Sequence, residues 1–241
     1  MAVATPSTFT GFPPEAVQFL ADLTANNDRA WFQPRKAEYE ELLKRPLEAL
    51  VAALAEEFAA RGLPLRADPA RSPFRIYRDV RFAKDKSPYK TNVGASFPWI
   101  GEGAGDVDGR SHTANVHSSG GYFHLSPGEI YVGGGYWRPE KPWLDAFRRR
   151  VADDPEEFRG LVDAPAFRAT FGALSTHGHA LQRVPAGFAP DHPEAETLKL
   201  RDVVFGRNLS DADAQSPDLP AIIADSLAAG KPLLAWLARL G

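Results

Sequence analysis

The sequence predicts an α+β fold, a mainly antiparallel sheet with N-terminal and C-terminal helices packed on it. Two observations lead to this expectation. Apolar residues recur at helical spacing near both ends of the chain, whereas in the middle they alternate at the period of two that is typical of strands. Helices and strands gathered in separate blocks are typical of α+β proteins rather than of parallel α/β sheets.

The N-terminal block contains three expected helical stretches. The first follows Pro13-Pro14 and carries an i, i+3, i+4, i+7 apolar stripe, and the second opens at Trp31-Phe32. The third has apolar residues along one face and ends at Gly62, a usual C-terminal stop, while Pro46 kinks or divides it. The apolar positions of the first and third stretches are Ala16, Phe19, Leu20, Leu23, Leu43, Leu47, Leu50, Leu54 and Phe58.

The central block reads as strands. Residues 74–82 alternate between apolar and polar, a turn follows at Ser87-Pro88, and residues 92–99 form a return strand. Residues 122–125 and 129–132 flank Ser126-Pro127-Gly128, a hairpin signal that favours antiparallel pairing.

The C-terminal block is again helical. We expect helices over 142–151, from Asp154, which caps its first turn, and around 219–227 and 233–240, with Asp191 capping a turn at 194–198. Residues 1–241 are interpreted as one domain, with a flexible N-terminus over 1–11 and a glycine-rich loop over 101–119.

The composition narrows the protein class. The chain has 241 residues and no cysteine, so disulfides and thiolate chemistry are excluded. A net charge of −3 and a pI of about 6.1 oppose a general nucleic-acid binder. No signal peptide or run of 18 apolar residues is evident, so we expect a soluble, cytoplasmic protein that does not bind membranes.

Positive charge is nevertheless concentrated between Arg71 and Lys90. This segment holds seven basic side chains against Asp79 and Asp85, a net charge of +5. A local positive patch attracts anions whatever the total charge of the protein. Two interpretations stay open: ion pairs of Arg78 with Asp79 and of Arg81 with Asp85 that pin the strand to its turn, or a site for an anion.

The leading hypothesis is a phosphate-like or nucleotide-like ligand bound at this segment. The expected ligand-binding residues are Arg75, Tyr77, Arg78, Arg81, Lys86, Tyr89 and Lys90. If there is catalysis, Asp79 or His124 is the expected general base, but the sequence does not decide whether the protein is an enzyme. The alternative is a non-catalytic module that docks an acidic protein or a nucleic-acid backbone, with Tyr77, Tyr89, Trp99 and Trp137 as anchors.

Other site types have weaker signals. Histidines occur at 112, 117, 124, 177 and 179, but their spacing matches no metal motif, so we expect no metal and no cofactor. Gly133-Gly134-Gly135 lacks the Gly-Lys-Ser/Thr of a phosphate loop and more simply indicates a bulge or a close backbone approach.

Several motifs together resemble the DUF2461 family of uncharacterised proteins. They are Asn26-Asn27 with Trp31-Phe32 and Tyr39; Arg78-Asp79-Val80-Arg81-Phe82 with Asp85-Lys86 and Pro88-Tyr89-Lys90; Gly133-Gly134-Gly135 with Trp137 and Pro139; and Pro185, Gly187-Phe188, Asp191-His192-Pro193 and Leu198. The resemblance spans roughly residues 9 to 210 and implies no activity. One departure is Ala186, which stands where the family often has a basic residue.

Overall fold

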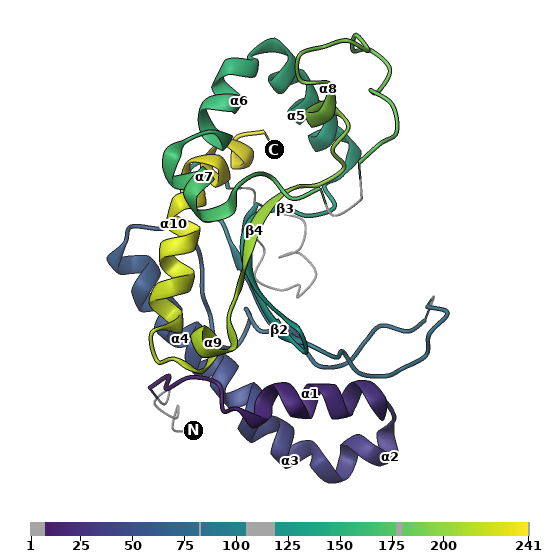
Figure 1. Cartoon of the computed structure of the whole chain (residues 1–241), viewed down its shortest axis with the longest axis vertical. Coiled ribbons are helices and arrows are strands. Elements are labelled where there is room, and N and C mark those ends of the chain that lie inside the picture. Colours follow the sequence, from purple (N-terminus) through teal and green to yellow (C-terminus); the bar gives the residue numbers. More distant parts are fainter. Residues whose placement is uncertain (1–7, 82, 105–118, 177–179, 241) are drawn as a thin grey trace.

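The protein contains one antiparallel sheet with helices against one face and at both ends (Figure 1). The structure, a computed structural model, describes residues 8–81, 83–104, 119–176 and 180–240. The strands are β1 (Val93–Pro98), β2 (Gly120–Ser126), β3 (Glu129–Tyr136) and β4 (Val203–Leu209), in the order β1-β2-β3-β4. The predicted α+β class is therefore confirmed, as is the hairpin around Pro127-Gly128.

The N-terminal helices lie at one end of the sheet and beside it. They are α1 (Glu15–Ala25), α2 (Arg29–Phe32), the 3-10 turn η1 (Gln33–Arg35), α3 (Lys36–Tyr39), the π turn η2 (Glu40–Lys44) and α4 (Arg45–Ala60). Pro46 follows the π turn η2 within a continuous run of helical residues; its missing N–H removes one helical bond, so the hydrogen bonding is irregular just before it. Gly62, at φ 58°, ends α4: its N–H bonds to Ala59 and the next N–H bonds to Phe58.

The helices after the hairpin cover the core face of the sheet and its other end. They are α5 (Lys141–Asp153), α6 (Pro155–Val162), α7 (Pro165–Phe171), α8 (Ala195–Leu198), α9 (Asp211–Gln215) and α10 (Leu219–Ala238). In Figure 1, α4, α7, α9 and α10 lie along one side of the strands, and α5, α6 and α8 lie at the top. Asp154 accepts a hydrogen bond from the Glu157 N–H at 3.1 Å, so the predicted cap of α6 is confirmed.

The core lies between the sheet and α10. Phe123, Val132 and Phe205 point from successive strands toward this helix and are fully buried. A Cβ on Gly230 of α10 would come within 2.3 Å of the Phe205 ring, so a side chain there would separate helix and sheet. By length and composition α10 would suffice to cross a membrane, but 56% of its most apolar window is buried inside the protein, as in a core helix.

Two element predictions were wrong, and a third was right about helix but missed its continuity. Residues 74–82 form no regular strand; Arg75–Lys90, named here the basic hairpin, holds only an isolated bridge between Tyr77 and Tyr89, and Phe82 lies outside the described residues. The two C-terminal helical stripes belong to one helix, α10, which continues through Pro232 because residues on both sides of it pack in the core. Asp191 does not cap α8: that helix has no side-chain cap bond, and the Glu194 N–H ahead of it donates to His192 Nδ1 at 3.0 Å.

Two predicted flexible segments are described only in part. Phe9, within the N-terminal stretch 1–11, is buried and contacts Phe12 edge-on, with ring centroids 5.8 Å apart. In the segment 101–119, the Glu102 carbonyl accepts a hydrogen bond from the Trp99 indole, whereas residues 105–118 lie outside the described residues.

Candidate functional site

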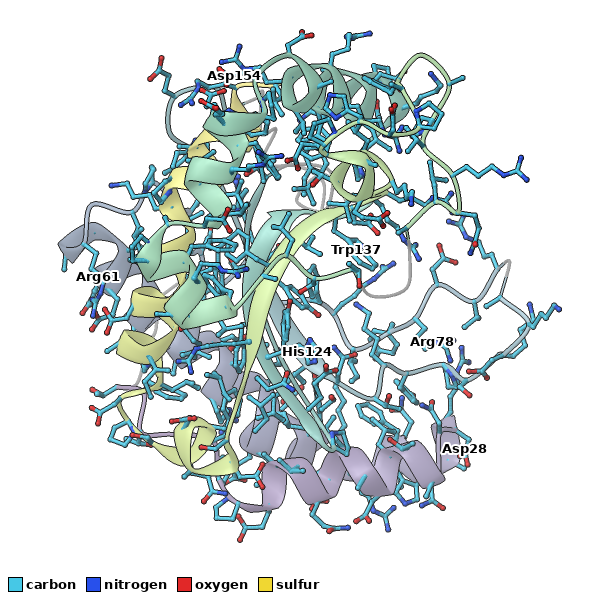
Figure 2. All side chains as sticks on the ribbon, turned by 45° about the horizontal axis from the view of Figure 1, so that its top comes forward. Asp28, Arg61, Arg78, His124, Trp137 and Asp154 are labelled. Carbon is cyan, nitrogen blue, oxygen red and sulfur yellow. The ribbon has the colours of Figure 1, made fainter. Side chains whose placement is uncertain are left out.

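The second face of the sheet, opposite the core face, carries a group of polar and aromatic side chains. Side chains alternate along a strand, so the core positions of Ala95, Phe123 and Val132 put their sequence neighbours on the second face. These neighbours are Ser96 on β1, Tyr122 and His124 on β2, and Tyr131 on β3. Figure 2 shows His124 on the strands and the basic hairpin with Arg78 further out on that side.

Tyr131 lies flat across two neighbouring glycines. A Cβ on Gly206 of β4 would come within 2.2 Å of the Tyr131 hydroxyl, and one on Gly133 within 2.8 Å of its ring. Burial raises the pKa of Tyr131, and a hydrogen bond with the Ser175 side chain opposes that effect. Because glycine has no side chain, β3 and β4 can hold this ring against their backbones. The predicted close backbone approach at Gly133-Gly134-Gly135 is confirmed, since a Cβ on Gly133 would also meet the Phe205 carbonyl at 2.2 Å.

His124 is fixed beside Tyr131. The two rings are nearly parallel, 19° apart with centroids separated by 5.6 Å, and His124 Nε2 lies 3.1 Å from a carboxylate oxygen of Glu129. Burial lowers the pKa of His124, and the neighbouring Glu129 carboxylate opposes this only in part. The imidazole is therefore neutral near pH 7, where it donates from Nε2 to Glu129 and presents Nδ1 as an acceptor.

Ser96 is buried without a hydrogen-bond partner. Its residue is 7% exposed, and its Oγ is the buried side-chain polar atom, among the described residues, that has no partner. Leaving a buried hydroxyl unpaired costs about 1–3 kcal/mol. Its cross-strand neighbour is Tyr122, whose pKa burial raises to about 12. An unpaired hydroxyl in such a group is expected where a ligand or water completes the bonding.

Lys90 and Arg75 bring positive charge to the edge of this group. Phe74 packs against Tyr122, with ring centroids 6.1 Å apart, and Lys90 Nζ lies 5.0 Å above the Phe74 ring. Burial lowers the pKa of Lys90, and the Arg75 charge lowers it further. Neither cation has a salt-bridge partner within the part of the chain that the structure describes.

The arginines at the outer end of the basic hairpin are paired with acids. Arg78 Nη1 lies 2.5 Å from Asp85 and also bonds to the Ser87 carbonyl, while Arg81 grips Asp79 through Nε and Nη2. The sequence pattern suggested ion pairs, but with the partners exchanged. The exchange arises because Asp79 and Asp85 each accept the backbone N–H two residues later, which curls the chain locally.

The other predicted ligand-binding residues have varied surroundings. Tyr89 is buried and stacked on Phe32 at 4.1 Å, and the Asn27 amide bonds to both its N–H and its carbonyl. Lys86 Nζ donates to the Val80 carbonyl, and Tyr77 is 48% exposed on the hairpin. Tyr89 thus anchors the hairpin to the N-terminal helices.

The comparison with protein families finds a match that covers nearly the whole chain. A family model described as "Conserved hypothetical protein (DUF2461)" matches residues 15–236. The chain belongs to the DUF2461 family. No curated protein and no solved structure matches it. Asn27 and Tyr89, two of the residues by which the chain resembles DUF2461, bond to each other across 62 positions of sequence in this member.

The two candidate general bases, Asp79 and His124, differ in how readily they accept a proton near pH 7. Arg81, through its side chain and its backbone N–H, lowers the pKa of Asp79 to about 2, and the guanidinium bonds to both carboxylate oxygens. A carboxylate so stabilised accepts a proton poorly near pH 7. If there is catalysis, His124, which is neutral and lies on the second face, fits the role of general base better than Asp79.

No metal centre is evident among the described residues of this DUF2461 member. They contain no group of three or more His, Asp or Glu side chains arranged to hold an ion. His112, His117, His177 and His179 lie outside these residues.

Sequence reasoning missed Ser96, Tyr122 and Tyr131. A usable signal was present, because polar and aromatic residues alternate with buried ones along both strands of the recognised hairpin. Glycines that face them on β3 and β4 were a second signal, but β4 itself was not predicted.

Proposed function

We propose that this DUF2461 member binds a small anion, phosphate-like or nucleotide-like, with Lys90 and Arg75 supplying the charge. Ser96, Tyr122 and His124 on the second face supply the neighbouring polar groups. The observation that carries the proposal is Lys90, a half-buried ammonium beside a like charge, on the edge of a group that contains an unpaired hydroxyl.

The two neighbouring positive charges favour an anion at this position. Burying an ammonium next to a guanidinium is unfavourable, and an anion between them would relieve both the desolvation and the repulsion. A phosphate or carboxylate accepts charge-assisted hydrogen bonds from both side chains, each worth about 1.5–3 kcal/mol.

Arg78 and Arg81 have a smaller part in this proposal than the sequence suggested. Their guanidinium groups already bond to Asp85 and Asp79, so an anion would have to compete with a carboxylate. Lys86 bonds to a backbone carbonyl of the hairpin. These residues are proposed to shape the hairpin that carries Arg75 and Lys90.

The test is a calorimetric titration with inorganic phosphate at constant ionic strength. Lys90→Gln and Arg75→Gln are each expected to weaken binding about tenfold or more, the equivalent of one lost charge-assisted bond. The matched control is Lys84→Gln, which removes an exposed charge from the same hairpin and should leave affinity within about twofold. Equal losses in all three variants would show that only the overall charge matters, and no loss at Lys90 would refute the site.

A second candidate function is docking of an acidic protein or a nucleic-acid backbone on the basic hairpin. It is favoured by the projection of this hairpin from the rest of the molecule (Figure 1) and by the exposure of Tyr77. Salt separates the two functions, because backbone binding weakens steeply with ionic strength, whereas one partly buried anion loses much less.

A further inference from the structure

The Tyr131 ring lies flat against the backbones of β3 and β4, and this feature distinguishes the second face from a site for a bare anion. A simple phosphate site needs only donors and cations. Here two strands have glycine at facing positions, Gly133 and Gly206, and the Tyr131 ring occupies the space that side chains would fill. The ring therefore lies parallel to the sheet surface. Its hydroxyl is hydrogen-bonded to Ser175, and the side chain is only half-buried.

His124 extends this aromatic surface. Its ring lies within 19° of the plane of Tyr131, and the Glu129 carboxylate fixes Nε2. In that tautomer Nδ1 is an acceptor whose lone pair lies in the ring plane, so the face of the imidazole is left for stacking. Parallel, fixed rings with polar edges are typical of surfaces that stack nucleobases.

Tyr122 connects the aromatic surface to the cations. Its ring centroid lies 6.4 Å from that of Tyr131 and 6.1 Å from that of Phe74, over which Lys90 Nζ sits. Ser96, paired with Tyr122 across β1 and β2, offers an unsatisfied hydroxyl between the two ends. Across the second face, an aromatic surface at Tyr131 and His124 is therefore followed by the Ser96 hydroxyl and then by the Lys90 cation.

We infer that the ligand is a nucleoside monophosphate or a chemically equivalent molecule, a planar heterocycle joined to an anionic group through a polar linker. Its ring stacks on Tyr131 and His124, its linker hydroxyl pairs with Ser96, and its anion lies at Lys90 and Arg75. This inference rests on the proposed function and adds the ring to it.

The experiment compares inorganic phosphate with the common ribonucleoside monophosphates, using the full chain and the same calorimetric titration. At least one nucleotide is expected to bind about tenfold more tightly than phosphate, since stacking on an aromatic side chain gives that order of gain. Tyr131→Leu should remove this advantage and leave phosphate affinity unchanged. Tyr131→Phe, which keeps the ring, should retain it, and His124→Leu gives an independent reduction if Tyr131→Leu does not fold.

The outcomes separate the two proposals. If phosphate binds through Lys90 but no nucleotide binds more tightly, the inferred ring is wrong and the proposed function stands. If a nucleotide advantage survives both Tyr131→Leu and His124→Leu, the stacking surface is refuted. If neither phosphate nor any nucleotide binds, the proposed function fails and this inference fails with it.

Discussion

His124 and Lys90 are partly buried side chains whose charged forms the fold disfavours. For both, loss of hydration is the largest cause of a lowered pKa. The two groups differ in their neighbours: Glu129 partly offsets the effect at His124, whereas Arg75 adds to it at Lys90. A partly buried histidine whose pKa is lowered from 6.5 makes the free energy of unfolding depend on pH in mild acid, where the protein can be studied.

The stability of the protein should therefore fall in mild acid through His124. Its folded-state pKa lies below the ordinary value of 6.5, so the unfolded chain binds the proton first as pH falls. Stability that is present above pH 6.5 is then lost as pH falls through the folded pKa. Urea unfolding between pH 7 and pH 5 should show a steeper loss for the natural protein than for His124→Gln, and equal slopes would contradict the burial argument.

The arginines of the basic hairpin form ion pairs whose partners the sequence does not specify. The charge density was evident from the sequence, and ion pairing among Arg78, Asp79, Arg81 and Asp85 was one of the two interpretations that it left open. Which acid meets which guanidinium depends on two local turns made by the aspartate side chains, and spacing along an assumed strand gave the wrong partners.

At the scale of elements, one of the two helix caps predicted from the sequence is confirmed and the other is wrong. Asp154 and Asp191 both precede a proline-containing segment and a short helix, so the sequence predicts an N-cap at both. In the structure Asp154 caps α6, whereas the His192 imidazole takes the backbone bond ahead of α8.

Replacing these two aspartates should have different effects. Asp154→Ala should lower the free energy of unfolding by about 1 kcal/mol, the usual cost of a lost N-cap. Asp191→Ala, the matched control on an exposed loop, should change it by less than about 0.5 kcal/mol. Urea denaturation measures both, and equal losses would contradict the assigned caps.

The sheet was predicted only in part, for a physical reason. The hairpin of β2 and β3 is local, so turn residues and alternation identify it. The fourth strand, β4, joins β3 across more than sixty intervening residues, and Val203-Val204-Phe205 is too short an apolar run to distinguish a strand from a helix. The alternating pattern of residues 74–82 was misleading because, over the described residues 74–81, the backbone bonds go to side chains and isolated bridges rather than to a ladder.

At the scale of the whole molecule, the helices described cover one face of the sheet and both its ends, and the basic hairpin projects beside the second face (Figure 1). In this arrangement Lys90 Nζ lies above the Phe74 ring, which packs against Tyr122 of β2. The sequence predicted the cations and His124 as candidate ligand-binding or catalytic residues. It did not predict Ser96, Tyr122 and Tyr131, because their placement depends on the register of three strands.

Lys90 provides the most direct test of an anion site on this face. Nuclear magnetic resonance of lysine side chains labelled with carbon-13 follows the titration of each ammonium with and without phosphate. We predict that Lys90 titrates below ordinary lysines in the absence of phosphate and that phosphate raises its pKa. An identical Lys90 titration with and without saturating phosphate would contradict the proposed site.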